Sequence, residues 1–371
     1  MVADVADGGS GLVMDGADGG SGLVAANSPE PRRAPEKSSQ KVAKTSGTSP
    51  TELPGDSDNS ENSDRTNYQK IAPAKTLGQL GGSVDAIAIS PDGKILVSGS
   101  GDGTIEVWNP KDGTKKSSLE SHKGRVWSLA ISPDSRILAS GSEDNTIKIW
   151  HLETGVLKAT LTGHGDWVSS LAISPDGRHL ISGSGDGTIK IWDLKAGVLN
   201  SSLLAHGDWV SALAIAADGR TLVSASFDKT IKIWQLKGAQ INFYSLLAGH
   251  SEPVRSVAIA PNGKTIASGS YDKTIKIWNP SEGKVELTLK GHSEAILSIA
   301  ISPDGQTLVS GSGDRSIKIW HILTGELIQT LAGHGDAVVS VAISAAIEGK
   351  GKTLASGSLD DTIKIWQLPN D

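Results

Sequence analysis

The 371-residue chain contains no cysteine, which excludes disulfides, thiolate metal ligands and cysteine nucleophiles but leaves the redox compartment open. Positive charge is not in excess: the formal net charge of -6 argues against a general nucleic-acid binder. No apolar run approaches the ~18 residues of a membrane helix, and the N-terminus lacks the basic start and apolar core of a signal peptide. We therefore expect a soluble, cytoplasmic protein with neither nucleic-acid nor membrane partners.

Phenylalanine and tyrosine are scarce, with 2 and 3 copies, whereas tryptophan occurs 10 times and glycine 44 times. Each of seven units, 42 to 46 residues apart, contains four short segments rich in valine, isoleucine, leucine and serine, separated by turns such as Pro175-Asp176-Gly177. This pattern predicts a four-stranded antiparallel meander in every unit. The repeating tryptophans that mark the units are Trp108, Trp150, Trp192, Trp234, Trp278, Trp320 and Trp366.

Residues 1–74 have a different composition, rich in glycine, serine, proline and acids, with Tyr68 as their one aromatic residue. They show no apolar period, and such a composition cannot offset the entropy lost on ordering the chain. We expect a disordered tail over 1–74 and a folded domain over 75–371. A flexible linker and a regulated or partner-binding tail are both open interpretations of this segment.

The glycine-histidine pair of most units, the SGSxD turn and the tryptophan six residues after that aspartate resemble WD repeats, such as those of bacterial proteins. The resemblance covers about Lys75 to Leu368, although the literal Trp-Asp pair occurs only at Trp192-Asp193. It implies an all-β, seven-bladed β-propeller of four-stranded antiparallel blades. Because the last unit stops after its third strand, residues 75–80 are predicted to supply the missing outer strand and close the ring.

Six units place a serine, a histidine and an aspartate in the same relative positions. In a hydrolase the histidine would activate the serine and the aspartate would orient the histidine. Six equal active sites are implausible, so a hydrolase is kept only as an alternative, and the resemblance implies a buried structural network that runs from indole to serine, imidazole and carboxylate. The first unit has Leu80 in place of the histidine and should be locally weaker. The network residues are His122, Ser140, Asp144, Trp150, His164, Ser182, Asp186, Trp192, His206, Ser224, Asp228, Trp234, His250, Ser268, Asp272, Trp278, His292, Ser310, Asp314, Trp320, His334, Ser356, Asp360 and Trp366.

Metal and cofactor chemistry has weak support in this sequence. The histidines are spaced a whole unit apart, and the Asp-Gly turns lack the ligand series of a calcium loop. The glycine-rich GSGDGT segments have no P-loop lysine and open a strand rather than a helix. We therefore expect no catalytic residues, no metal and no cofactor.

Three tryptophans fall outside the repeating position and flank the valine that starts the first segment of units two to four. By the resemblance, this place and the residue before the turn aspartate face the top rim of the central channel, where WD-repeat proteins commonly contact peptides. The alternative is that each tryptophan packs a loop against its own blade. Together they predict a partner-binding arc formed by Arg125, Trp127, Glu143, Trp167, Trp209, Phe227, Arg255 and Tyr271.

The function predicted from this pattern is a non-catalytic, monomeric scaffold that binds a protein or peptide, with a recognition module of a larger signalling complex as an alternative. Five acidic residues follow the histidines of units three to seven. They are either solvated loop charges or an acidic rim that favours a basic partner. These residues are Asp166, Asp208, Glu252, Glu294 and Asp336.

Two irregular segments interrupt the repeat: NFYSLL, which contains Phe243 and Tyr244, and AAIEGKGK, which begins at Ala345. We expect both to form turns on the face opposite the arc. They are interpreted as tolerated insertions, with a second contact surface as the alternative.

Overall fold

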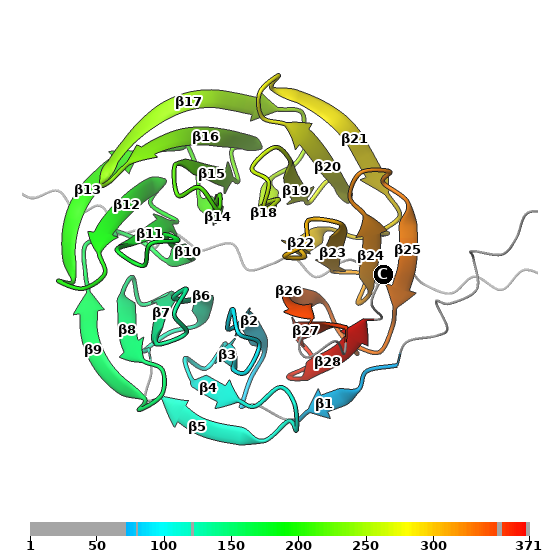
Figure 1. Cartoon of the computed structure of the whole chain (residues 1–371), viewed down its shortest axis with the longest axis horizontal. Helices are drawn as coiled ribbons and strands as arrows, with labels where there is room; N and C mark the ends of the chain where they lie inside the picture. The colour runs from blue at the N-terminus through cyan, green and yellow to red at the C-terminus, as the bar shows by residue number, and fades with distance from the viewer. Residues whose placement is uncertain (1–71, 79–80, 120–121, 347–350, 369–371) are drawn as a thin grey trace, which may run out of the picture. The chain divides into compact units, whose positions relative to one another are not determined.

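The computed structural model describes residues 72–78, 81–119, 122–346 and 351–368. These residues form seven four-stranded antiparallel sheets arranged around a ring, which confirms the predicted all-β, seven-bladed β-propeller (Figure 1). The predicted tail, residues 1–74, lies outside the described residues except for its last three. Within the described ranges, no helix is long and apolar enough to cross a membrane.

Blades 1 to 7 are numbered in the order of their innermost strands, and each blade runs outward from the channel as a meander. The innermost strands are β2 (Val84–Ile89), β6 (Val126–Ile131), β10 (Val168–Ile173), β14 (Val210–Ile215), β18 (Val254–Ile259), β22 (Ile296–Ile301) and β26 (Val338–Ala346). The second strands are β3 (Leu96–Ser100), β7 (Ile137–Ser142), β11 (His179–Ser184), β15 (Thr221–Ser226), β19 (Ile266–Ser270), β23 (Thr307–Ser312) and β27 (Lys352–Ser358). The third strands are β4 (Ile105–Trp108), β8 (Ile147–His151), β12 (Thr188–Asp193), β16 (Thr230–Lys237), β20 (Thr274–Asn279), β24 (Ile317–His321) and β28 (Ile363–Leu368). The outer strands are β5 (Lys115–Leu119), β9 (Val156–Leu161), β13 (Val198–Leu204), β17 (Gln240–Ala248), β21 (Lys284–Lys290), β25 (Leu327–Leu331) and, in blade 7, β1 (Lys75–Leu77).

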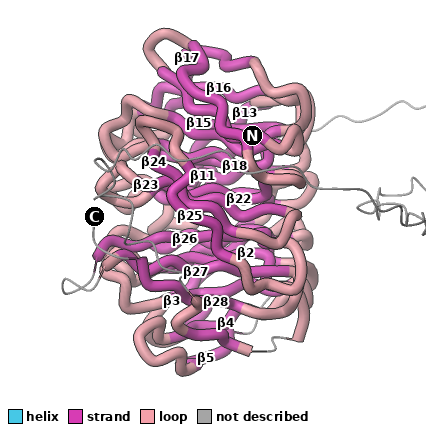
Figure 2. The backbone as a smooth tube through the Cα atoms, turned by 90° about the vertical axis from the view of Figure 1, so that its right-hand side faces the viewer, coloured by secondary structure: helices cyan, strands magenta, loops and turns pink. Residues whose placement is uncertain are grey.

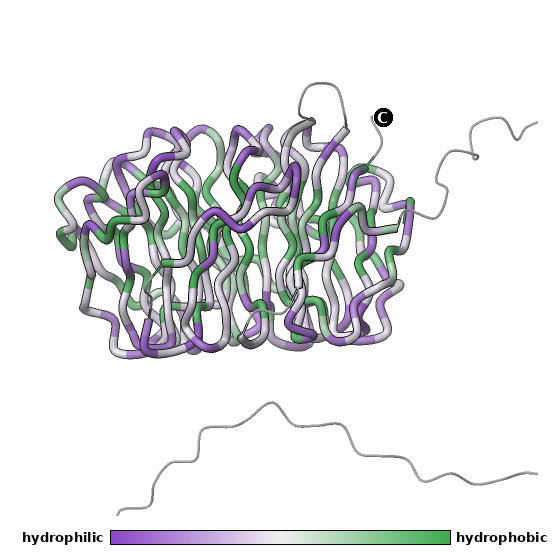
Figure 3. Tube along the Cα trace, turned by 90° about the horizontal axis from the view of Figure 1, so that it is seen from below, coloured by the Kyte–Doolittle hydropathy of each residue, from purple (hydrophilic) through white to green (hydrophobic). Residues whose placement is uncertain are grey.

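The core lies between neighbouring blades, because the third strands carry apolar residues on both faces. Ile181 and Ile191 of blade 3 pack in one buried cluster with Val210 and Trp234 of blade 4. The blades approach closely at the second strand, where a Cβ added to Gly183 would lie 2.6 Å from Cγ1 of Val210. Seen edge-on, the ring is hydrophobic at mid-height and hydrophilic along both loop faces (Figure 3).

The first chain segment of the ring completes the last blade. β1 pairs antiparallel with β28, with Lys75 opposite Ile365 and Leu77 opposite Ile363. Leu77 is buried at 6% exposure, and β26 contacts β2, so the innermost strands meet all the way round. The strand predicted over residues 75–80 is observed as Lys75–Leu77, and residues 79–80 lie outside the described residues.

Blade 4 has a longer outer hairpin than its neighbours (Figure 2). β16 and β17 pair out to Lys237 and Gln240, so only two residues turn between them. Phe243 and Tyr244 therefore lie within β17, 58% and 55% exposed, and their predicted placement in a turn is wrong. The sequence shows two extra residues here but not that both strands extend to absorb them. The AAIEGKGK segment continues β26 to Ala346, and residues 347–350 lie outside the described residues.

Candidate functional site

The structure brings the predicted network residues together in blades 2 to 7. In each, the tryptophan Nε1 donates to the serine Oγ at 2.8–3.1 Å. The same serine Oγ lies 2.7–2.8 Å from the histidine Nε2. The histidine Nδ1 lies 2.7–3.0 Å from an aspartate Oδ2. Each set is therefore a continuous chain of four polar groups, here called the polar network of its blade.

The direction of these bonds follows from what each group can donate. A carboxylate only accepts, so the neutral imidazole carries its hydrogen on Nδ1 and offers Nε2 as an acceptor to the serine hydroxyl. The serine then has its own hydrogen committed and accepts from the indole. These serines are buried at 0% exposure, so a substrate carbonyl cannot reach them. The distances match those of a hydrolytic triad, but burial and the indole donor favour a structural role.

The predicted arc residues all lie at one end of the blades, which we call the top face. Arg125 immediately precedes β6, and Glu143 lies in the turn between β7 and β8. Because these strands are antiparallel, the start of the first strand and the end of the second lie side by side at the same end of the blade. The same reasoning places Trp167, Trp209 and Tyr271 on the top face of their own blades.

Five aromatic rings from blades 2 to 5 contact one another in series across the top face, and we call them the aromatic arc: Trp127, Trp167, Trp209, Phe227 and Tyr271. Successive ring centroids are 5.9, 4.9, 4.9 and 5.6 Å apart along this order. Tyr271 is 40% exposed and the other four are partly buried. The tryptophans therefore pack mainly on each other across blade boundaries, and the open apolar patch is smaller than three isolated indoles would give.

A family model for WD40, described as WD domain, G-beta repeat, matches seven consecutive segments of the chain. The matched residues are 73–109, 113–151, 155–193, 197–235, 242–279, 283–321 and 325–367. The chain belongs to the WD40 family. Each repeat joins the outer strand of one blade to three strands of the next, since 73–109 contains β1 of blade 7 and β2 to β4 of blade 1. WD40 propellers are typically protein-interaction scaffolds and are generally non-catalytic. A search of curated protein sequences gave no match.

Charged residues of this WD40 ring surround Trp127. The Arg125 and Arg255 guanidinium carbons lie 5.1 and 6.0 Å from its ring centroid, within cation–π range. Arg125 also pairs with Asp85 at 3.4 Å. Burial raises the pKa of Asp85 to about 6, although Arg125, a Ser83 hydrogen bond and Arg255 oppose the rise.

Asp85 is a residue that sequence reasoning missed. It follows the valine that starts β2, as Trp127 and Arg255 follow the equivalent valines of β6 and β18. Comparing this single position around all seven units would have identified it as the one acidic side chain in the series. The arc was instead found from its large residues, and the first unit was passed over.

The rim acids differ in their partners. Glu252 and Glu294 pair with Lys229 and Lys273 at 3.5 and 3.3 Å. By contrast, the side-chain carboxylates of Asp166, Asp208 and Asp336 accept only from the backbone amide of the next residue among the bonds within the described ranges. Two of the five predicted rim charges are therefore neutralised within the propeller.

The carboxyls and imidazoles of the networks have shifted pKa values. Burial alone would raise the pKa of three of the aspartates, but hydrogen bonds from hydroxyls, backbone amides and the paired imidazoles outweigh it and lower the pKa to about 2 in Asp186, Asp314 and Asp360. Burial also lowers the pKa of five histidines from 6.5, against the attraction of their carboxylate partners: His122, His164, His250, His292 and His334.

Blade 1 shows what a network without its histidine looks like. Trp108 Nε1 still donates to Ser98 Oγ at 3.0 Å, but Asp102 is exposed, unlike the six other network aspartates. Trp108 is 7% exposed, compared with at most 4% for the other repeating tryptophans. Leu80, at the histidine position, lies outside the described residues, and local weakness of this blade stays a prediction.

Replacing one network histidine tests the structural role. His206→Ala should lower the free energy of unfolding by about 1–3 kcal/mol, because Ser224 and Asp228 each lose a buried hydrogen-bond partner. Urea denaturation followed by tryptophan fluorescence measures the change. His151→Ala is the control, since His151 lies on the third strand outside every network. An equal effect of both changes would contradict the assignment.

Proposed function

We propose that this WD40 protein is a non-catalytic scaffold that binds a peptide or protein segment at the aromatic arc on its top face. The observation that carries the proposal is the unbroken ring-to-ring contact of five aromatic side chains contributed by four blades. No single blade needs these contacts for its own core, because each already has a buried network tryptophan. Tryptophan and tyrosine are also enriched among the few interface residues that dominate binding energy.

The composition of the rim supports a site on one side of the channel mouth. At the positions that flank the starting valine or isoleucine, blades 6 and 7 carry Ala295, Leu297, Ala337 and Val339, which are small or aliphatic. The arc and its two arginines occupy blades 2 to 5 instead. A bound segment would therefore lie across these four blades rather than over the whole ring.

We further propose that the partner segment carries positive charge. Glu143 is exposed beside the arc, and Asp166 and Asp208 adjoin Trp167 and Trp209 without a cationic partner among the described residues. Of the two arginines beside Trp127, Arg125 is paired with Asp85, and Arg255 donates to the Ser211 carbonyl. The acids beside the arc thus favour a basic segment, which would also associate faster at low ionic strength.

The double change Trp167→Ala with Trp209→Ala should weaken partner binding by about 2 kcal/mol or more, roughly thirtyfold, with little change in thermal stability. Affinity purification with the intact protein and the variant identifies the partner, and calorimetric titration of the purified pair measures the loss. Phe243→Ala with Tyr244→Ala is the matched control, because it removes two exposed aromatic rings from β17.

A partner lost equally from both double variants would place the contact elsewhere than the arc. If the Trp167 and Trp209 variant unfolds instead of losing its partner, the rings serve blade packing. Increasing salt should weaken binding to the intact protein, and salt-independent binding would contradict the basic partner.

A further inference from the structure

A cavity lies between blades 3 and 4 on the face opposite the aromatic arc. It has a volume of about 350 Å³ and opens beside two turns, one leading from β10 to β11 and the other from β14 to β15. Asp176 and Asp218 are exposed at its rim, while Ile181 and Leu236 are buried in its lining. His179 lines it as well, and the unit-to-unit comparison gives isoleucine or threonine at that position in the other six blades. The cavity thus combines carboxylates with an apolar wall.

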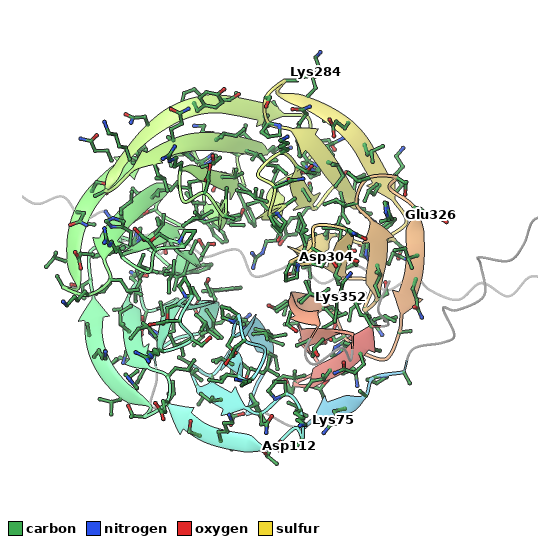
Figure 4. All side chains as sticks on the ribbon, viewed as in Figure 1. Lys75, Asp112, Lys284, Asp304, Glu326 and Lys352 are labelled. Atoms are coloured by element: carbon green, nitrogen blue, oxygen red, sulfur yellow. The ribbon has the colours of Figure 1, made fainter. Side chains whose placement is uncertain are left out.

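The corresponding place between blades 6 and 7 is filled by a side chain of the protein itself. Lys352 is buried at 6% exposure and places Nζ 2.7 Å from Oδ2 of Asp304 and 3.0 Å from Oγ1 of Thr307. The Asp304 and Lys352 labels mark this junction in Figure 4. Burial alone would raise the pKa of Asp304, but hydrogen bonds from Lys352 and Ser302 outweigh it and lower the pKa. The fold therefore already accommodates a buried alkylammonium group at one inter-blade junction.

The acceptors at the two junctions correspond residue by residue. Asp304 uses Oδ1 for Ser302 and the Gln306 amide, and Asp176 uses Oδ1 in the same way for Ser174 and the Arg178 amide. Oδ2 binds Lys352 in Asp304, whereas in Asp176 it makes no hydrogen bond or ion pair with any residue that the structure describes. The Ser174 hydrogen bond lowers the pKa of Asp176, so its carboxylate is charged at neutral pH.

The other two positions differ between the junctions, and the difference leaves space for an ammonium group between blades 3 and 4. His179 stands where Thr307 does, each opposite the residue that follows the network tryptophan. Its Nδ1 is buried and has no hydrogen-bond partner within the described residues. Arg220 stands where Lys352 does, but it is exposed and its guanidinium forms no ion pair with the described part of the chain. The blade 3 and 4 junction has the acceptors of the lysine site without the ammonium.

We propose that this cavity binds a primary alkylammonium group, supplied by a lysine side chain of a partner polypeptide. The ammonium would donate to Asp176 Oδ2 and His179 Nδ1, and the alkyl chain would pack on Pro175 and Leu236 in the cavity lining. A second hollow of about 720 Å³ shares Asp218, Gly219, Leu236 and Gly238 with the cavity and extends to Asn242. This extension gives space for backbone on either side of the lysine, which favours a polypeptide over a free amine.

The test titrates the full-length protein with the peptide acetyl-Gly-Gly-Lys-Gly-Gly-amide. Nuclear magnetic resonance follows the backbone amides of Gly219 and Gly238 and the imidazole of His179. The lysine peptide should shift all three signals and should bind more tightly than butylammonium, which has the same charge without flanking backbone. The same peptide with norleucine in place of lysine should leave the signals unchanged.

Asp176→Asn should weaken lysine-peptide binding at least about tenfold, because it removes the charged acceptor. Asp134→Asn is the matched control: Asp134 makes the same turn hydrogen bonds to Ser132 and the Arg136 amide but lines neither hollow. Equal weakening by both variants, equal binding of the norleucine peptide, or no shift with the lysine peptide would overturn the proposal. Butylammonium binding as tight as the peptide would assign the site to free amines and overturn the polypeptide assignment. Because the arc is unaltered in these variants, failure here is separate from failure of the top-face proposal.

Discussion

A chain that lacks residues 1–78 is expected to be at least about 4 kcal/mol less stable than a chain that lacks residues 1–71. The longer deletion removes β1, and with it the burial of Leu77, for which about 2 kcal/mol is typical. It also removes the β1–β28 ladder and the bond from the Ala74 amide to the Ile365 carbonyl, each hydrogen bond contributing about 1 kcal/mol. Guanidinium denaturation of the two truncated proteins, followed by circular dichroism, measures the difference.

The longer deletion should lower the stability more than a single substitution in β1 does. Leu77→Ala in the full chain removes most of the buried side chain but keeps the ladder, so its effect should fall between those of the two truncations. The longer deletion also leaves β28 as an open edge in front of Ile363 and Ile365, so it should raise the tendency to aggregate. Identical denaturation midpoints for both truncations would show that β1 does not close the ring.

The fold was predictable because a seven-times repeated pattern averages out local ambiguity. Spacing of the tryptophans predicted the number of blades, and the seventh unit, which holds three predicted strands, pointed to β1 as its fourth. The polar networks were equally accessible, since serine, histidine and aspartate recur at fixed offsets. Features that recur in the units of the sequence therefore recur in the blades of the structure.

Features that occur once were harder to predict. The extended β16–β17 hairpin depends on where the two extra residues of unit four are absorbed, and strand pairing out to Lys237 and Gln240 decides this. The cavity beside His179 exists because Arg220 is exposed to solvent, whereas Lys352 at the equivalent position is buried. Such choices are made by packing between blades, which no single unit of the sequence encodes.

The aromatic arc lies between these two cases. Its residues were predicted one by one from their positions in each unit, whereas their contact in series depends on how neighbouring blades are spaced. Trp127 and Trp167 stack although they flank the starting valine on opposite sides, because each belongs to a different blade. Such a contact arises from the spacing of neighbouring blades in the ring, and the sequence of either repeat alone does not predict it.

Acid is expected to destabilise the propeller in two steps. The first concerns five network histidines, whose pKa in the folded chain is below the ordinary 6.5. Below pH 6.5 the unfolded chain therefore binds protons that the folded chain does not, and the free energy of unfolding falls as the pH falls. Protonation would also place a hydrogen on Nε2, where each imidazole now accepts from its serine.

The second step concerns Asp186, Asp314 and Asp360, whose pKa in the folded chain is about 2 against an ordinary 3.8. A lowered carboxyl pKa contributes stability that is present above pH 3.8 and is lost as the pH falls toward 2. After allowance for solvent screening, about 1 kcal/mol is expected from each of the three. Asp85 acts in the opposite sense, because its pKa is raised to about 6 and its protonation below that pH relieves a buried charge.

Urea midpoints measured at pH 7.5, 5.5 and 4.0 should therefore decrease steadily, and unfolding should be nearly complete near pH 2. The variant His164→Asn removes one titrating imidazole, so its midpoint should be lower at pH 7.5 but should fall less between pH 7.5 and 4.0. Asp85→Asn should steepen the fall, because it removes the one site in this set that gains stability on protonation. Midpoints that stay constant from pH 7.5 to 4.0 would mean that the imidazoles keep the same pKa on unfolding and that burial does not hold them neutral.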